Sequence, residues 1–414
     1  MGGLRRFVTF ADQGVSSVSN FVAVAVAANV AGTGEFGQFS LAYAGLLLFL
    51  GAQRAFVGET LLVRYSRTGA LTARVAAASL GGSLLVAVPA ALFLLAGAAL
   101  AGERNALLWA VMAAAAPLIL LQDGLRYLFI CEGRPGRALA IDGLWAALSI
   151  PAMVLAAGED WSLAAVLGWW IAGAGAALAV GLILARAVPA VRAGGRWLWL
   201  NRDCSFRYLA EFAALNASSF AVLYLLVFPL GPAGVGALRA AQLLFSPLNT
   251  VFAALRTAII PELVRARGTV VFRRRLTEAT AVVLGLALCW GAAVLMLPQA
   301  AGEFVLGDTW SNATELRWPS AFQYLAMVPY TILLAYFRAS EANRLSTLVR
   351  GILAGATRVL PLGFALTGST AASAWGFTAA VALAAVCGLL AVRAGRRRVP
   401  SGPNPEQPQR VRGR

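Results

Sequence analysis

The chain has 414 residues, of which 60% are hydrophobic and 13% charged, and its mean hydropathy is +0.75. So few polar side chains cannot cover the surface of a water-soluble domain, and that class is excluded. The sequence has no His, which excludes a His general base, a His metal ligand and a Ser-His-Asp triad. We expect neither a metal nor another cofactor.

Twelve apolar segments follow one another along the chain. A helix of about 20 apolar residues crosses the ~30 Å of hydrocarbon in a bilayer. We therefore predict an all-α polytopic membrane protein with about 12 transmembrane helices. In chain order, the predicted spans are 9–31, 38–58, 75–100, 106–130, 137–157, 162–186, 208–230, 235–258, 276–298, 316–337, 345–367 and 371–392.

Arginine supplies all 34 basic residues and falls mostly on one side of the predicted membrane. With the connections assigned alternately to two sides, 27 Arg share a side with both termini, two (Arg104 and Arg317) face the other side, and five lie within spans. By the positive-inside rule the Arg-rich side is cytoplasmic, so we place both termini there and the protein in the cytoplasmic membrane. The net charge of +16 then indicates membrane lipids, and not nucleic acid, as partners.

The second half of the sequence repeats the first, at an offset of 199 residues over positions 11–42 and of 209 residues where Tyr127 matches Tyr336. Six spans per repeat give both halves the same orientation, so we predict two lobes in a 6+6 parallel repeat, with a site between them. The predicted parts are an N-terminal lobe at 1–186, an amphipathic cytoplasmic linker at 187–207, a C-terminal lobe at 208–395 and a disordered basic tail at 396–414.

Polar residues inside the predicted spans concentrate on single helix faces, on spans one and eight above all. A charge at the bilayer centre costs at least about 3 kcal/mol, so such residues are expected to face protein or a water-filled cavity. The predicted substrate cavity is lined by Arg54, Arg239, Gln242, Asn249, Arg256, Asn20 and Gln13, with Asp12 and Glu211 as coupling-ion or counter-ion residues.

Two interpretations of these residues remain open at this stage. Arg suits a phosphate or pyrophosphate, because its guanidinium binds two oxygens at once and keeps its charge. Alternatively, an Arg within a span pairs with an acid, such as Arg54 with Asp12, and only holds helices together. For Asp12 and Glu211 a structural counter-ion role competes with a role in coupling.

Four further charged residues lie within the predicted spans. The stretch 122–126, with Asp123 and Arg126, is expected to form a salt bridge that reaches the cytoplasmic interface. Asp142 is expected to pair with Arg126 or with another Arg at the start of its span. Arg358, within span eleven, either faces the cavity or braces its lobe.

Short motifs occur at matching places in the two halves. In the first half they are Asp12-Gln13 followed by Val15 to Asn20, Gly34 to Ala42 at the start of span two, and the segment around Arg54. In the second half they are Gly231 to Gly236, Arg239 to Gln242 and Pro261 to Leu263. With twelve spans and a 6+6 repeat, residues 1–395 resemble the multidrug/oligosaccharidyl-lipid/polysaccharide (MOP) exporter superfamily, and especially its bacterial polysaccharide flippase (Wzx-like) branch.

This resemblance implies two lobes in a V that alternate between inward- and outward-open states. It also implies a cationic cavity for the head group of an undecaprenyl-pyrophosphate-linked glycan. Relatives that flip the peptidoglycan precursor use Arg residues in their first, second and eighth spans. Arg54 and Arg256 match the last two, but span one has Asp12 and Gln13 and no Arg, and no extra pair of spans follows the twelfth. The resemblance therefore favours a different lipid-linked glycan.

The sequence thus predicts a flippase, with no enzymatic activity, that exports a polyprenyl-pyrophosphate-linked saccharide for cell-surface polysaccharide synthesis by alternating access. Its expected partners are this lipid-linked glycan and the polymerase and glycosyltransferases of the same pathway. A drug/cation antiporter of the same fold is the alternative, although an Arg-lined cavity disfavours a cation. A membrane-embedded polymerase or glycosyltransferase is the enzyme alternative, but the outward acids, such as Glu303 and Asp308, lie on short loops.

Overall fold

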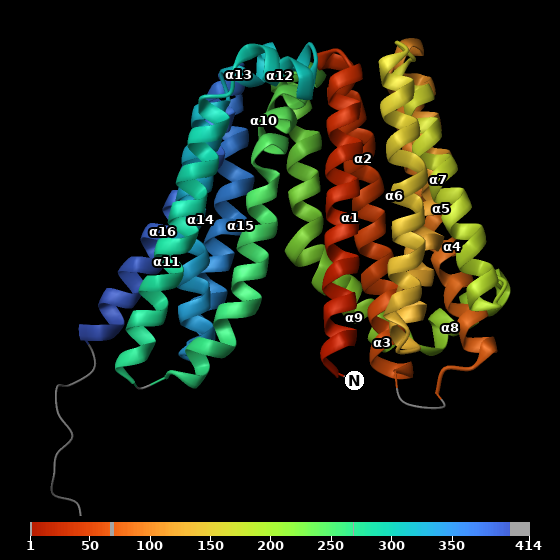
Figure 1. Cartoon of the computed structure of the whole chain (residues 1–414), viewed down its shortest axis with the longest axis horizontal. Coiled ribbons are helices and arrows are strands. Elements are labelled where there is room, and N and C mark those ends of the chain that lie inside the picture. The colour runs from red at the N-terminus through yellow and green to blue at the C-terminus, as the bar shows by residue number, and fades with distance from the viewer. Residues whose placement is uncertain (1, 67–69, 268, 398–414) are drawn as a thin grey trace, which may run out of the picture.

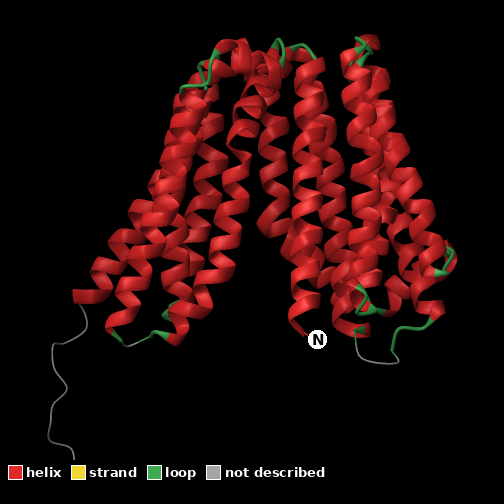
Figure 2. Cartoon of the chain, in the orientation of Figure 1, coloured by secondary structure: helices red, strands yellow, loops and turns green. Residues whose placement is uncertain are grey.

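The computed structural model describes residues 2–66, 70–267 and 269–397, and these ranges are almost entirely helical (Figures 1 and 2). Side chains are described in the same ranges except at 2–13, 215, 217–218, 256–258 and 395–397. The helices form two bundles that lie close together at one end and diverge toward the end that carries the N-terminus (Figure 1). The all-α prediction is confirmed. The predicted tail at 396–414 lies outside the described residues from 398 onward.

The N-terminal bundle contains six membrane-crossing segments. Its second segment runs from α2 through a π-helical stretch, η1, into α3 without a break. Thr72 and Ser162 cap α4 and α7, because their hydroxyls accept the backbone N–H groups of Val75 and Ala165. The elements are α1 (Gly2–Val30), α2 (Thr33–Gln53), η1 (Arg54–Glu59), α3 (Thr60–Tyr65), α4 (Ala73–Leu100), α5 (Glu103–Cys131), α6 (Pro135–Gly158) and α7 (Leu163–Ala185).

The C-terminal bundle contains the other six segments. Its first two lie within one long element, α10, which is divided at Gly231, where φ is 66°. Glycine adopts this left-handed conformation without strain, and Pro232 suits the first turn of the helix that follows. The elements are α9 (Arg202–Phe212), η2 (Ala213–Ala217), α10 (Ser218–Arg265), α11 (Val270–Leu295), α12 (Gln299–Leu306), α13 (Thr309–Thr314), α14 (Arg317–Ala339), α15 (Asn343–Ala365) and α16 (Thr370–Arg397).

The number of spans agrees with the sequence prediction. Among the described residues, 10 helices are long and apolar enough to cross a membrane, and one of them is the stretch of 47 residues within α10 that holds two spans. The apolar part of α1, Gly14–Val30, supplies the remaining one. The described part of the chain therefore has twelve segments suited to crossing a membrane, as expected of a multi-pass membrane protein.

Small residues hold the two bundles together at the end opposite the N-terminus. A Cβ on Gly37 of α2 would lie 1.8 Å from the carbonyl oxygen of Pro232, and a Cβ on Gly236 would lie 2.3 Å from the carbonyl oxygen of Thr33. The backbones of α2 and α10 therefore touch, with no room for a larger side chain. The Thr309 hydroxyl adds hydrogen bonds from α13 to two carbonyl oxygens near the end of α1.

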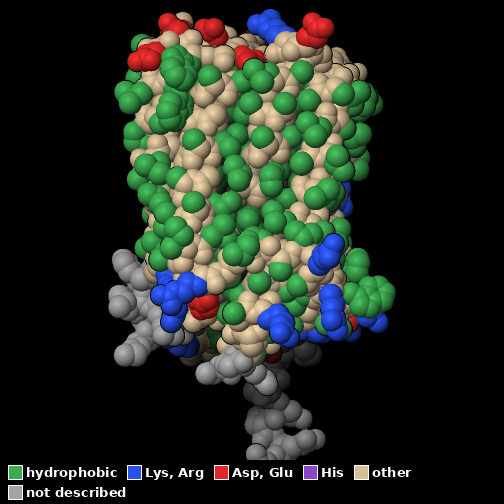
Figure 3. Space-filling view, turned by 90° about the vertical axis from the view of Figure 1, so that its right-hand side faces the viewer, with side chains coloured by type: hydrophobic (Ala, Val, Ile, Leu, Met, Phe, Trp, Pro, Cys, Tyr) green, Lys and Arg blue, Asp and Glu red, His purple; other side chains and the backbone are tan. Residues whose placement is uncertain are grey.

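Charged side chains separate toward the two ends of the molecule. Figure 3 shows an apolar band on the N-terminal bundle, with Arg side chains below it and most of the Asp and Glu side chains above it. Acidic residues of the upper turns include Glu103, Glu159, Asp160 and Glu303. We call the end with the N-terminus the basic end and the opposite one the acidic end. This asymmetry is the one that the positive-inside rule associates with a cytoplasmic basic end.

The connection between the bundles folds back onto the N-terminal bundle at the basic end. Helix α8 (Val191–Leu200) packs on α4, where a Cβ on Gly194 would lie 2.5 Å from the carbonyl carbon of Gly81, and Trp197 is buried. Helix α9 is joined to α3 because Arg64 donates to Asn201 at 2.9 Å and pairs with an acid of α9. The span that leads into the C-terminal bundle therefore begins on the N-terminal one.

Candidate functional site

Four charged side chains form a cluster inside the N-terminal bundle, where η1, α5 and α6 meet. Arg54 donates two hydrogen bonds to Asp123, from Nη2 to Oδ1 at 2.7 Å and from Nε to Oδ2 at 3.0 Å. The guanidinium of Arg126 lies 3.9 Å from Asp123 and 3.5 Å from Asp142. Gln122 donates to Asp142 at 2.6 Å. Two guanidinium groups thus face two carboxylates, which cancels the formal charge in a setting where a net charge is costly.

A small cavity of about 40 Å³ opens beside this charged cluster. Its lining residues include Ser16 and Asn20 of α1, Trp145 of α6 and Trp170 of α7. A cavity of this size holds water molecules but has no room for a sugar, since one water needs about 10–15 Å³ on this measure.

Arg54 is held in place by the π-helical stretch that it begins. Such stretches are rare and occur mostly as single turns near functional sites. The Tyr127 ring lies against Gly58, where a Cβ would be 2.6 Å from Cδ1 of the ring, and Gln53 donates to Ser83 of α4 at 2.9 Å. Helices α4 and α5 therefore fix the orientation of η1 and with it the direction of the Arg54 side chain.

Tyr43 lines the small cavity together with Arg54, and its side chain is buried. On the polar face of α10, Arg239 donates to Gln242 at 3.4 Å, and within the described part of the chain no carboxylate lies within 4 Å of its guanidinium. An anion between the bundles at this level would therefore meet a guanidinium that no described carboxylate neutralises.

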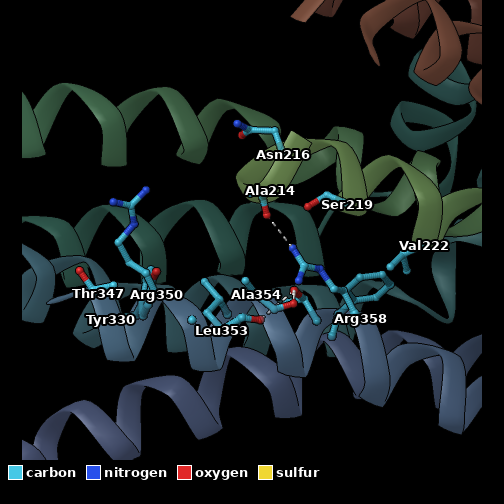
Figure 4. Close-up of a pocket in the computed structure, with 13 residues that line it drawn as sticks. Ala214, Asn216, Ser219, Val222, Tyr330, Thr347, Arg350, Leu353, Ala354 and Arg358 are labelled. Carbon is cyan, nitrogen blue, oxygen red and sulfur yellow. Dashed lines mark hydrogen bonds between the residues drawn. The ribbon is translucent and has the colours of Figure 1, made fainter. Parts of the chain in front are cut away.

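A much larger cavity, of about 650 Å³, lies between η2, the start of α10 and helices α14 to α16 (Figure 4). Arg350 and Arg358 of α15 line it, and Nη2 of Arg358 donates to the carbonyl oxygen of Ala214 in η2 at 3.3 Å. Asn216 and Ser219 face them from the other wall. No Asp or Glu is among the described residues that line this cavity, so its formal charge is positive.

The residues predicted for the site occupy several places. Asn20 and Arg54 line the small N-terminal cavity. Asn249, on the face of α10 that begins with Arg239, donates to the hydroxyl of Tyr324 at 2.9 Å, and Glu211 is exposed at the C-terminal end of α9. Three predicted residues have side chains that lie outside the described set: Asp12, Gln13 and Arg256.

The interfacial interpretation of the stretch 122–126 is wrong. Asp123 and Arg126 are 3% and 8% exposed, because they pair inside the bundle and do not extend to its surface. Arg54 pairs with Asp123 where the sequence suggested Asp12 as a partner. Asp142 does lie beside Arg126, as one of the two alternatives had it.

Sequence reasoning missed Arg350 as a candidate site residue and left Arg358 undecided. The signal was present in their spacing. Eight residues of an α-helix turn the chain by two full turns and about 80°, so the two side chains leave α15 within one quarter of its circumference, and both line the cavity. The opposite wall of the cavity could not be predicted from the sequence, because η2 is more than a hundred residues away from these Arg residues along the chain.

Comparison with known proteins supports the architecture. No family profile and no curated protein sequence matches the chain. Among solved structures, the lipid II flippase MurJ in an inward closed conformation aligns with a TM-score of 0.70 at 12% identity, over 94% of this chain and 87% of that one. An inward-facing multidrug resistance MATE family transporter of the MOP superfamily aligns with a TM-score of 0.62 at 15% identity, over 94% of this chain and 99% of that one.

The chain has the fold of the MOP-superfamily transporters. A third example is a MOP-superfamily transporter from Pyrococcus furiosus, whose binding pocket is described as having reverse polarity. It aligns with a TM-score of 0.58 at 14% identity, over 94% of each chain. Transporters with quite different substrates therefore share this fold, and the substrate of this chain has to be argued from its own cavities.

Proposed function

We propose that this chain is a flippase that moves a polyprenyl-pyrophosphate-linked saccharide across the bacterial cytoplasmic membrane, for cell-surface polysaccharide synthesis. The observation that carries the proposal is the positive charge of the 650 Å³ cavity, where Arg350 and Arg358 lie without a carboxylate among the described lining residues. Pyrophosphate is a strong partner for guanidinium groups, because both make charge-assisted hydrogen bonds in pairs. A saccharide head group suits a cavity of this volume.

The arrangement of the bundles supports transport by alternating access. The bundles touch through glycine backbones at the acidic end and diverge at the basic end (Figure 1). A substrate loaded from the cytoplasm would enter between them, and rocking of the bundles would expose it on the other side. The polymerase and glycosyltransferases of the same pathway are the proposed partners.

A drug/cation antiporter is the second candidate, and one observation favours it. Asp123 and Asp142 are carboxylates buried within the membrane region, which is a common feature of cation and proton sites. Each is within 4 Å of an Arg, however, so neither offers a cation an uncompensated charge. The charge of the two cavities together therefore favours an anionic substrate.

The test is the sidedness of lipid-linked glycans after depletion of the protein. We expect these glycans to accumulate in the inner leaflet, and the wild-type chain to restore their export. Arg358→Ala, which removes one guanidinium from the 650 Å³ cavity, is expected to restore less, whereas Arg104→Ala, in the first turn of α5 at the acidic end, is a matched control that should restore export fully. Glycan lipids that stay evenly exported after depletion, together with a gain in sensitivity to cationic drugs, would move the antiporter to first place.

A further inference from the structure

The C-terminal cavity (Figure 4) has Arg residues without a described carboxylate on its wall, whereas each Arg of the N-terminal cluster lies beside an Asp. We infer that the pyrophosphate group binds in the C-terminal cavity, between η2 and α15, on Arg350 and Arg358. The identity of the lipid rests on the proposed function. The recognised chemistry, a pyrophosphate with two or more negative charges, rests on the cavity itself.

The charged residues around the N-terminal cluster and the C-terminal cavity favour the cavity as the place where pyrophosphate binds. In the N-terminal cluster Arg54 is already bound at both its Nε and its Nη2 by Asp123, and Arg126 lies beside Asp142. A phosphate that entered there would have to displace a carboxylate and leave it buried without its partner, which is strongly unfavourable. In the C-terminal cavity no described carboxylate has to be displaced, because none lines it.

The geometry of α15 suits a group with two adjacent phosphates. Arg350 and Arg358 are separated by about 12 Å along the helix axis, and long Arg side chains can converge over that rise from the same face. Gly351 and Ala354 lie between them on the cavity wall and leave the space in front of the helix empty. Thr347 adds a hydroxyl donor at the end nearer the cytoplasm.

One contact that Arg358 makes in this state, with Ala214, is of a kind that an anion can replace. Its bond to the carbonyl oxygen of Ala214 is 3.3 Å long, beyond the usual 2.7–3.2 Å, and a neutral carbonyl is a weaker acceptor than a phosphate. The bond joins α15 to η2, which directly follows α9. Helix α9 is held on the N-terminal bundle by an edge-to-face contact of Phe206 with Phe56 of η1, at 5.2 Å between ring centroids.

Replacement of the bond between Arg358 and Ala214 by a bond to pyrophosphate would therefore couple binding in the cavity to the relative position of the bundles. When pyrophosphate binds the guanidinium of Arg358, the hydrogen bond between α15 and η2 is broken. The span that connects the two bundles is then less restrained and can move. The site thus connects binding with the rocking motion that transport requires.

The experiment measures binding to the full-length protein in nanodiscs by native mass spectrometry. The probes are undecaprenyl pyrophosphate, undecaprenol as the neutral lipid and inorganic pyrophosphate as the soluble anion. The variants are Arg350→Gln, Arg358→Gln, the double variant and Arg54→Gln, with Arg344→Gln as the matched control because it is exposed on α15 and does not line the cavity. Retained thermal midpoints and monodisperse elution establish that each variant is folded.

We expect each of the two α15 substitutions to weaken binding of undecaprenyl pyrophosphate about tenfold, which equals about 1.4 kcal/mol, and the double variant about 100-fold. The control should bind as the wild type does. Undiminished binding by a folded double variant, with loss in Arg54→Gln, would overturn the assigned site and leave the proposed function intact.

Two further outcomes separate the sources of the pyrophosphate. If the wild type binds undecaprenyl pyrophosphate no better than undecaprenol but binds inorganic pyrophosphate in an Arg358-dependent way, the site stands and the proposed lipid substrate fails. If the wild type binds neither undecaprenyl pyrophosphate better than undecaprenol nor inorganic pyrophosphate, both the site and the proposed lipid substrate fail.

Discussion

The pair of Arg54 and Asp123 should contribute to stability in a way that a double-mutant cycle can measure. The two hydrogen bonds, at 2.7 and 3.0 Å, have the bidentate geometry that makes such pairs strong. The Asp123 side chain is 5% exposed and that of Arg54 is 38% exposed, so the pair is only partly buried. Breaking a fully buried pair costs about 3–5 kcal/mol, and a surface pair contributes about 0–1 kcal/mol, so this pair should fall between the two. We place its coupling energy at about 2–3 kcal/mol.

The two single substitutions are expected to differ. Arg54→Gln leaves a buried carboxylate whose nearest remaining guanidinium is that of Arg126, at 3.9 Å, and should cost about 3 kcal/mol of unfolding free energy. Asp123→Asn leaves a guanidinium that is partly exposed and can rotate toward water, and should cost about 2 kcal/mol. The double variant removes both charges and should cost about as much as one single substitution.

The assay is reversible unfolding in mixed micelles of detergent and SDS, followed by circular dichroism. Arg104→Gln, at an exposed position near the acidic end, is the control for removal of an Arg and should change the unfolding free energy by less than about 0.5 kcal/mol. Costs that simply add in the double variant would refute the reasoning, because they would mean that the two side chains do not stabilise each other.

The remaining predictions concern the contacts that join the parts of the molecule. Gly37→Leu should force the bundles apart at the acidic end, because a larger side chain has no room beside Pro232. We expect cysteines introduced at that end to be labelled more and export to fall at least tenfold. Unchanged labelling would contradict the close approach of α2 and α10. Gly231→Ala should cost about 1–2 kcal/mol of stability, because φ is 66° there, and an unchanged SDS midpoint would speak against the left-handed conformation. Trp197→Ala should release α8 from α4 and speed limited proteolysis between the bundles, whereas a digestion rate equal to that of the wild type would show that α8 is held by other contacts.

The sequence was sufficient for the features that depend on short stretches of chain. Span length and the sidedness of Arg are local properties, so the twelve spans and the basic end followed from them. The partner of Arg54 did not, because Asp123 lies 69 residues away and is brought near by the packing of α5 on η1. The π-helical stretch has no periodic signature in the sequence, and it shifts the register of the residues that follow it.

The same limit applies to the C-terminal cavity. The stripe of Arg350 and Arg358 can be found from helical spacing alone, but whether it faces lipid, protein or a cavity depends on the element opposite. That element is η2, whose Ala214 has no distinguishing side chain and contributes only a carbonyl oxygen. A backbone group of this kind cannot be recognised as part of a site from residue types.

The internal repeat explains why the two bundles differ in charge. At the 209-residue offset that matches Tyr127 with Tyr336, the positions of Asp123 and Arg126 correspond to Ile332 and Ala335, which are buried and apolar. The C-terminal repeat therefore has no acid at the position that corresponds to Asp123, the residue that neutralises Arg54. This difference in compensation agrees with the proposed division, in which the N-terminal cluster braces its bundle and the C-terminal cavity binds the anion.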